Sequence, residues 1–243
     1  PNCIARKDGD SFVLSGQKAA WFSNGTIANA AAMFCAVDMG DGVRRDGGML
    51  VPLDVPGVTK GKPLDKIGQR ALNQGELFFD DVRFPADYMV IPPEAYAIAL
   101  EMILTGANGG MGSIFVGVAQ AALDLALDYA RERVQGGVPI FEHQAVKMRL
   151  FEMFRKVQAA RALSRQVTLY NQMNPAPKLK LAVASKVTST NTAFEVASSA
   201  LQIFGGNGLS REYPVEKLLR DARASMIEDG CNDVLSLTAA ESL

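Results

Sequence analysis

Two acidic residues stand side by side near the end of the sequence, within the segment from Met226 to Asp233. A carboxylate in such a place can act as a general base, and the glycine that follows, Gly230, lets a ligand approach the backbone closely. Acidic residues before a helix are equally suited to capping its N-terminus. The residues alone leave both interpretations of Glu228 and Asp229 open.

Three glycines in four residues, Gly205, Gly206 and Gly208, follow an apolar segment that ends at Phe204. Glycines after a helix commonly form its C-terminal cap. They also expose backbone amides, as a ligand phosphate or ribose requires. The motif alone does not choose between a cap and a ligand loop.

A third segment holds the only tryptophan, Trp21, followed by Phe22, Ser23 and the turn Asn24–Gly25. A core tryptophan is the plain interpretation. The functional interpretation is a flat aromatic ligand that packs near Trp21.

A glycine turn at 136–137 has polar residues on both sides. Arg133 precedes it and is suited to a pyrophosphate, although a solvated helix face explains an arginine equally well. His143 follows the turn and is typical of the polar start of a helix. With one histidine and three widely separated cysteines, the chain carries no His-rich or CxxC pattern, so we expect no metal site and no disulfide framework.

The first 90 residues, which must position Trp21, contain short apolar runs separated by glycine, proline and aspartate. The runs lie at 11–14, 31–37, 48–52 and 76–85. Short strands with such turn residues between them predict a small β-barrel or sandwich domain over residues 1–90.

Residues 91–243 carry the other candidate residues and repeat apolar side chains every three or four positions. The repeats lie near 93–130, 142–170, 179–204 and 214–243. This spacing predicts an antiparallel four-helix bundle, and the chain as a whole is predicted to be α+β. The uncharged stretch 102–123 contains polar residues and five glycines, which favours a buried bundle helix over a membrane span.

The composition sets the class of protein. Of 243 residues, 48% are apolar and 21% charged, which is enough to bury a core. Lys and Arg number 25 against 26 Asp and Glu, so no basic excess points to nucleic acid. The N-terminus has no signal-peptide pattern and no Met, which fits a start inside a longer protein.

Taken in order, the motifs resemble the acyl-CoA dehydrogenase family, flavoproteins that oxidise acyl-CoA thioesters. Seven separated motifs match along essentially the whole chain. They are residues 21–25, 78–85, 130–133, 142–146, 202–209, 211–217 and 220–223. The resemblance implies the family's middle β domain and C-terminal helical domain, without its N-terminal helical domain.

The resemblance implies FAD as cofactor and assigns contacts to it. Trp21 and Ser23, with Phe22 between them, correspond to residues that pack against and hydrogen-bond the flavin ring. Cys231 and Asp233 correspond to flavin contacts after the catalytic segment. The residues that correspond to contacts with the pyrophosphate and adenosine half in a neighbouring subunit are Arg133, Gln144, Gln202, Gly205 and Gly206. These roles imply at least a dimer, and the family implies a homotetramer, a dimer of dimers.

The base position departs from the family pattern. The usual segment is Tyr-Glu-Gly-Thr, with the glutamate as base; alignment on Gly230 puts Glu228 at the tyrosine and Asp229 at the base. Asp229 is therefore the first candidate base and Glu228 the second. Some relatives use a base on the earlier helix, near Ala107 and Asn108, where this sequence has no acid.

The implied reaction is FAD-dependent α,β-dehydrogenation of an acyl-CoA thioester. The base removes the α proton, the β carbon gives a hydride to flavin N5, and the Asp229 amide and a ribityl hydroxyl polarise the carbonyl. Aspartate draws the carboxylate back by about an ångström compared with glutamate, a shift that costs about a hundredfold if nothing compensates. Relatives often carry a substrate-side arginine where Asn108 stands. We expect Asn108 and Gly230 to contact the substrate, which favours a cyclic or branched acyl group.

The expected partners are acyl-CoA, an electron-transfer flavoprotein as acceptor and further copies of the chain, but neither nucleic acid nor a membrane. The expected compartment is the bacterial cytoplasm or the mitochondrial matrix. The alternatives are a flavin oxidase or monooxygenase on the same fold, which would react with oxygen, and a non-catalytic assembly protein, which would hold little flavin and would not depend on Asp229.

Overall fold

The computed structural model describes residues 2–243, apart from the side chains of Ala19 and Ala20; Pro1, where the expected start inside a longer protein falls, lies outside the described residues. The chain divides into two compact units, Pro1–Lys66 with Arg70–Leu100, and Ile67–Gln69 with Glu101–Leu243. We call them the β unit and the helical unit. The division at residue 90 stays a prediction.

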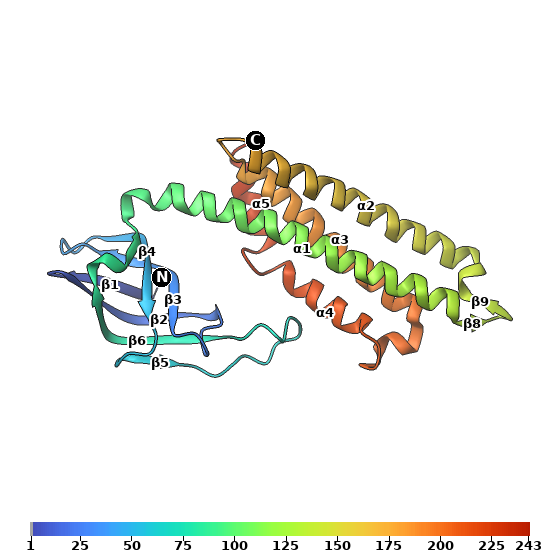
Figure 1. Ribbon diagram of the computed structural model, residues 1–243, viewed down its shortest axis with the longest axis horizontal. Helices are drawn as coiled ribbons and strands as arrows, with labels where there is room; N and C mark the ends of the chain where they lie inside the picture. The colour runs from blue at the N-terminus through green and yellow to red at the C-terminus, as the bar shows by residue number, and fades with distance from the viewer. Residues whose placement is uncertain (1) are drawn as a thin grey trace. The chain divides into compact units, whose positions relative to one another are not determined.

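The β unit is built on one seven-stranded mixed sheet that curls into a half-barrel (Figure 1), which confirms the predicted small β domain. Its strands are β1 (Cys3–Asp8), β2 (Ser11–Ser23), β3 (Ala30–Asp38), β4 (Arg44–Pro52), β5 (Val58–Lys60), β6 (Gln74–Pro85) and β7 (Met89–Ile91). They lie in the order β5-β6-β2-β1-β3-β4-β7, and all neighbours are antiparallel except β1 and β3.

The core of the β unit lies on one face of this sheet. Burial alternates along β6 until Phe79, as expected for a strand with one face toward the core and one toward solvent. Phe12 and Leu14 of β2 are buried opposite Phe84 and Val82 of β6. This face anchors the strand that carries Trp21.

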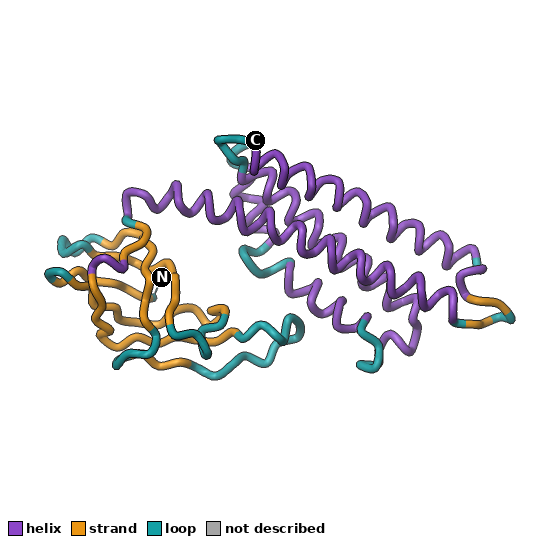
Figure 2. The backbone as a smooth tube through the Cα atoms, in the orientation of Figure 1, coloured by secondary structure: helices purple, strands orange, loops and turns teal. Residues whose placement is uncertain are grey.

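The helical unit contains five α-helices and a short hairpin. They are α1 (Tyr96–Glu132), of which residues from Glu101 on belong to this unit, the hairpin β8 (Val134–Gln135) and β9 (Val138–Pro139), α2 (Gln144–Met173), α3 (Leu179–Phe204), α4 (Val215–Ser225) and α5 (Asn232–Ala240). The three long helices run antiparallel, and α4 and α5 pack against α3 (Figure 2). The unit is the predicted helical bundle, with two short helices in place of the fourth long one.

The predicted fourth segment breaks because the backbone reverses between α4 and α5. Asp229 has φ of 50° and Gly230 has φ of 99°, values that no α-helix contains. Glycine adopts this region without strain, and aspartate tolerates it better than most residues. As a result, Val234 and Leu237, which belong to the predicted apolar repeat at 214–243, are 61% and 71% exposed on α5.

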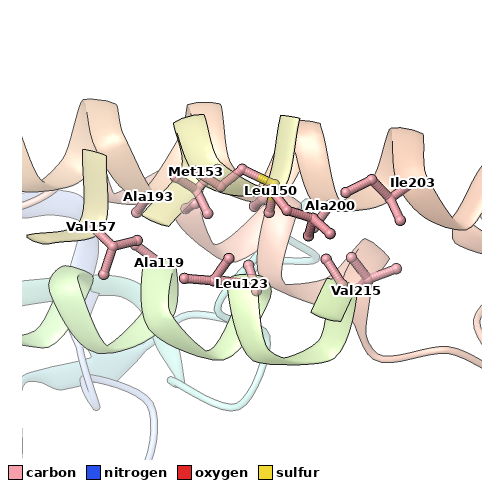
Figure 3. Packing of buried hydrophobic residues seen from close by; sticks show 14 of the residues in the cluster. Ala119, Leu123, Leu150, Met153, Val157, Ala193, Ala200, Ile203 and Val215 are labelled. Carbon is pink, nitrogen blue, oxygen red and sulfur yellow. The ribbon is translucent and has the colours of Figure 1, made fainter. Parts of the chain in front are cut away.

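The bundle core is assembled from small and medium apolar side chains of four helices (Figure 3). Ala119 and Leu123 of α1 meet Leu150 of α2, Ala200 of α3 and Val215 of α4. Small residues let the helix backbones approach closely, which keeps α3 at the centre of the unit.

One helix among the described residues, Pro93–Glu132, is long and apolar enough by length and composition to cross a membrane. Of its most apolar window, 44% is buried inside the protein. A core helix of a bundle has the same composition, and residues 102–123 were predicted to form such a helix.

Candidate functional site

The two candidate bases lie in the turn between α4 and α5, residues 226–231, which we call the acidic turn. The amides of Ile227 and Glu228 both donate to the carbonyl of Ala224, at 3.0 and 3.2 Å, and continue the last turn of α4. The amide of Asn232 then donates to the carbonyl of Met226 at 3.0 Å and closes the loop. The acidic turn is therefore a hydrogen-bonded structure rather than a loose connection.

The two carboxylates differ in their surroundings. An oxygen of Glu228 accepts a hydrogen bond from the side-chain amide of Gln69, and the backbone amide of Gln69 donates to Asp221. Asp229 is exposed, and within the described part of the chain neither its carboxylate nor its amide makes a hydrogen bond. Glu228 is anchored to the helical unit, whereas Asp229 is presented to solvent. Gln69, distant in sequence, carried no signal that could have identified it.

A buried lysine lies under the acidic turn. Lys186 of α3 has no exposed surface, and its amine donates to the carbonyl of Gly230 at 2.7 Å and to Oδ1 of Asn232 at 2.9 Å. Burial lowers the pKa of Lys186, while the negative charges of Asp229 and Glu228 act in the opposite direction. Lys186 is not among the residues predicted from the sequence.

Two further candidate flavin contacts are the last residue of the acidic turn and the second residue of α5. Cys231 is half-buried, carries a free thiol and stands at the N-cap of α5. Asp233 is exposed in the first turn of α5, where a negative charge is favourable to the helix dipole. The N-cap position of α5 belongs to Cys231, so neither Glu228 nor Asp229 caps this helix.

The glycine loop lies at the C-terminal end of α3. Gly205 is the C-cap, with φ of 60°, as the plain interpretation of this motif predicted. A Cβ added to Gly205 or Gly206 would meet nothing within 4 Å, and Gln202 is exposed beside them. The outer surface of this loop is therefore open to a ligand.

An aromatic cluster supports the glycine loop from behind. The rings of Tyr129 and Phe204 stack with centroids 4.1 Å apart. The side-chain amide of Asn207 donates to the hydroxyls of Tyr129 at 3.0 Å and Tyr213 at 3.3 Å. These contacts bring the ends of α1 and α3 together and hold the loop in place.

The two remaining polar candidates lie near the same end of the bundle. The amide of Arg133 donates to the carbonyl of Tyr129 at 2.8 Å, and the exposed side chain follows α1 directly. Gln144 is exposed at the first position of α2. His143 is the N-cap of that helix, and its Nε2 lies 3.0 Å from the carbonyl of Gln135, as expected for a polar residue at a helix start.

The glycine loop and the acidic turn are far apart along α3. Lys186 contacts the acidic turn, and Gly205 lies 205 − 186 = 19 residues later. At 1.5 Å per residue, these positions are separated by about 28 Å along the helix axis. The two groups of candidate residues therefore occupy separate regions of the helical unit.

In the β unit, Trp21 lies where the pairing of β2 with β6 is irregular. Register shifts between Lys18 and Phe22, and this bulge carries Trp21 on the outside with 63% of its surface exposed. The interpretation of Trp21 as a core residue is wrong. Phe22 is half-buried against the core of the sheet, and Ser23 is exposed. An exposed indole beside an exposed hydroxyl offers a surface for a flat polar ring.

Asn108, predicted as a substrate contact, lies inside the helical unit. Its side chain has no exposed surface, and its amide donates to the carbonyl of Leu104 at 2.8 Å. Its Oδ1 has no hydrogen-bond partner among the described residues. A substrate contact by Asn108 stays a prediction, and in this chain its side chain is turned toward the bundle.

A hollow of about 350 Å³ lies between α1 and α2, and glycines of α1 form much of its wall. Its α1 side includes Gly106, Gly109 and Gly110, and its α2 side includes Thr168 and Asn171.

Among residues 2–243, no three His, Cys, Asp or Glu side chains gather as metal ligands.

Two protein-family models match the chain. The model described as acyl-CoA dehydrogenase, middle domain, matches residues 1–82, and the one described as acyl-CoA dehydrogenase, C-terminal domain, matches residues 97–243.

Individual proteins agree with these models. The mitochondrial short-chain specific acyl-CoA dehydrogenase of Bos taurus is 37% identical over 98% of this chain and 58% of its own length. The cyclohexane-1-carbonyl-CoA dehydrogenase of Geobacter metallireducens is 31% identical over 98% of this chain and 62% of its own. The structure of butyryl-CoA dehydrogenase from Megasphaera elsdenii superposes with a TM-score of 0.91 and 32% identity, covering 99% of this chain and 62% of that one. The chain thus spans about three fifths of the length of these relatives.

Proposed function

The chain belongs to the acyl-CoA dehydrogenase family, and on that premise we propose that its protein catalyses α,β-dehydrogenation of an acyl-CoA thioester with Asp229 as the base. One observation carries the choice of base. Asp229 is the exposed carboxylate of the acidic turn, whereas Glu228 is hydrogen-bonded to Gln69.

The chemistry of the turn follows from its geometry. The carboxylate of Asp229 takes the α proton of the thioester, and the electron pair of that C–H bond forms the new C=C bond as a hydride leaves the β carbon. The amide of Asp229, which has no acceptor within the described residues, is proposed to donate to the thioester carbonyl. An oriented N–H of this kind stabilises the enolate-like charge that develops on that oxygen.

FAD, on which members of this family depend, would supply the acceptor for the hydride when bound. The residues present fit parts of such a group: Trp21 and Ser23 offer an exposed ring and hydroxyl, and Gly205 and Gly206 leave backbone open at the loop. We assign the ring contact to Trp21, Phe22 and Ser23, with Cys231 and Asp233 as further flavin contacts.

The remaining contacts are proposed to serve the flavin of a second subunit. Gln202, Gly205 and Gly206 lie at the end of α3, about 28 Å from the acidic turn by the rise of 1.5 Å per residue. Arg133, just after α1, and Gln144, at the start of α2, lie near the same end of the bundle. One chain therefore offers two separate groups of cofactor residues. Exposed apolar side chains on α2, such as Met148 and Phe151, give the helical unit surfaces suited to association, which supports a homotetramer.

For the substrate, we propose a cyclic or branched acyl group. The shorter side chain of Asp229 draws the base back, so a substrate has to bring its α carbon closer. One relative is named for cyclohexane-1-carbonyl-CoA, whereas others are named for short-chain substrates. Gly230, without a side chain, leaves the backbone beside the base accessible, and we propose it as a substrate contact.

The acceptor of the electrons is proposed to be an electron-transfer flavoprotein.

The relatives include a mitochondrial enzyme from Bos taurus and enzymes from bacteria, and we propose the mitochondrial matrix or the bacterial cytoplasm as the compartment.

An oxygen-free titration tests this function. The full-length protein is loaded with FAD, and its visible absorbance is followed while straight-chain, branched and cyclic acyl-CoA thioesters are added. We expect bleaching with at least one thioester, fastest with the cyclic or branched ones, and slow reoxidation of the reduced enzyme by air. Rapid reoxidation by air would identify an oxidase instead. Bound FAD that no thioester bleaches would contradict the dehydrogenase function.

A further inference from the structure

The most deeply buried charged group of the helical unit lies under the acidic turn that carries the candidate base. Lys186 is fully buried on α3. Its amine donates one hydrogen bond to the acidic turn and one to Asn232, the first residue of α5. One acceptor is the carbonyl of Gly230, the residue after Asp229. The amine therefore holds the peptide between Gly230 and Cys231, which follows the peptide that joins Asp229 to Gly230.

A second layer of hydrogen bonds orients the lysine and its partner. Asn232 is almost fully buried, accepts from Lys186 and donates to the hydroxyl of Thr190 at 3.0 Å. That hydroxyl donates back to the carbonyl of Lys186 at 2.9 Å. Lys186, Asn232 and Thr190 thus form a closed ring of contacts between α3 and the start of α5.

The cost of burying an ammonium group needs a compensating interaction. Two neutral acceptors offset only part of the desolvation of a lysine. The charged or titratable groups that act on Lys186 are Asp229, Glu228 and Cys231, all in the acidic turn, and each favours its protonated form. A lysine at this place therefore attracts the turn by charge as well as by hydrogen bonds.

We propose that Lys186 is a positioning residue for the base: its amine holds the Gly230 carbonyl and the Asn232 side chain, and so fixes the backbone that presents Asp229 to the thioester. This inference rests on the proposed function. Lys186 touches neither substrate nor cofactor in this role, because it lies on the inner side of the turn with no exposed surface.

A matched pair of lysines allows a controlled test in the full-length FAD-loaded enzyme. Lys186→Met keeps the length and volume of the side chain but removes the donors. Lys180→Met is the control, since Lys180 lies on the same helix and donates to a different backbone carbonyl, that of Ser242, at 2.5 Å. Thr190→Val removes one hydroxyl of the supporting ring and serves as a milder variant if Lys186→Met fails to fold.

Two readouts separate positioning from general stability. In Lys186→Met we expect amide hydrogen exchange over residues 226–232 to quicken by about tenfold while α1 and α2 peptides are unchanged. We expect kcat to fall about 30-fold to 100-fold with KM within about threefold, since the base is displaced while binding contacts remain. Thr190→Val should also quicken the exchange and lower kcat, each by about threefold to tenfold. Lys180→Met should change neither.

Unchanged exchange in Lys186→Met, or faster exchange with unchanged kcat, would overturn the role of Lys186. If Lys186→Met does not fold, unchanged exchange in Thr190→Val, or faster exchange in it with unchanged kcat, would overturn the role of Lys186. A wild-type enzyme that oxidises no thioester would overturn the proposed function instead, and the exchange comparison would then decide by itself whether Lys186 holds the turn.

Discussion

The side chain of Leu235 occupies the space into which a larger residue 230 would project. A Cβ atom added to Gly230 would lie 2.9 Å from Leu235, and Gly230 has φ of 99°. The acidic turn therefore depends on glycine for two reasons: the backbone conformation and the close approach of α5. Both conditions are set by the packing of the first turn of α5 beneath the base.

This contact predicts that Gly230→Ala destabilises the protein by about 2–4 kcal/mol, the sum of a strained backbone and an overpacked contact. Gly117→Ala is the control, since an added Cβ at this exposed position of α1 meets nothing within 4 Å. Alanine in a helix should stabilise it by about 0.5–1 kcal/mol. Urea denaturation measures both, and equal stability of the two variants would refute the packing argument.

Lys186 predicts a dependence of stability on pH. Burial lowers its pKa below the ordinary value of 10.5, so between the two values the unfolded chain binds a proton that the folded chain does not. The free energy of unfolding of the wild type, minus that of Lys186→Met, should therefore rise with pH between these two pKa values. Below the lower pKa value, this difference should be constant. Urea denaturation across this range tests the sign. A difference that falls with rising pH would contradict it.

The cysteines should differ in reactivity. Cys3 and Cys35 are buried on adjacent strands, and desolvation raises the pKa of Cys3 to about 12 and that of Cys35 to about 11. Cys231 is partly exposed. Iodoacetamide at mildly alkaline pH should modify Cys231 first, since thiolates are the reactive form. If Cys231 contacts the flavin, FAD should slow its labelling. Peptide mass spectrometry reads both effects, and equal labelling of all three thiols would be the contrary result.

Trp21 offers a fluorescence test of the flavin-ring contact. The emission of Trp21 is the part of the fluorescence that disappears in Trp21→Ala. FAD should quench this emission, since the exposed indole is proposed to pack on the flavin ring. Loss of one aromatic contact, worth about 0.5–1.5 kcal/mol, should weaken FAD binding about threefold to tenfold. Trp21→Phe should restore most of the affinity. Trp21 would be excluded as a flavin contact if FAD left its emission unchanged and Trp21→Ala bound FAD as tightly as the wild type.

The longer elements were predictable because their apolar spacing is regular. Four of the strands and the first three long helices coincide with predicted runs. β1 was missed because only Cys3 and Ala5 are buried, and its second half, Arg6–Asp8, is charged and exposed. The break between α4 and α5 was missed because apolar periodicity continues on both sides of Asp229 and Gly230, although the backbone does not.

The buried face of α3 shows why Lys186 was overlooked. Leu181 and Val187 belong to the apolar repeat at 179–204 that predicted this helix, yet they are only half-buried, and Ala184 is exposed. The face that packs at the centre carries alanine, serine and threonine, because neighbouring helices leave little room. Lys186 lies on this small-residue face. Its spacing of three and four from Val183, Ser189 and Thr190 is the signal that could have indicated it.

The candidate site residues were found by resemblance, and their exposure came only from the structure. Periodicity indicates neither that Trp21 projects outward from a bulge nor that Glu228 is hydrogen-bonded to Gln69. Both depend on contacts between residues far apart in sequence, which local patterns do not encode.

The most direct test of the central claim is the rate of oxygen-free flavin bleaching by the best thioester in Asp229→Asn and Glu228→Gln. Asparagine keeps the size of Asp229 but accepts no proton, so the rate should fall about 100-fold to 10,000-fold. Glu228→Gln should stay within about tenfold of the wild type, since glutamine can still bond to Gln69. A large loss in Glu228→Gln with a nearly unchanged Asp229→Asn would contradict Asp229 as the base.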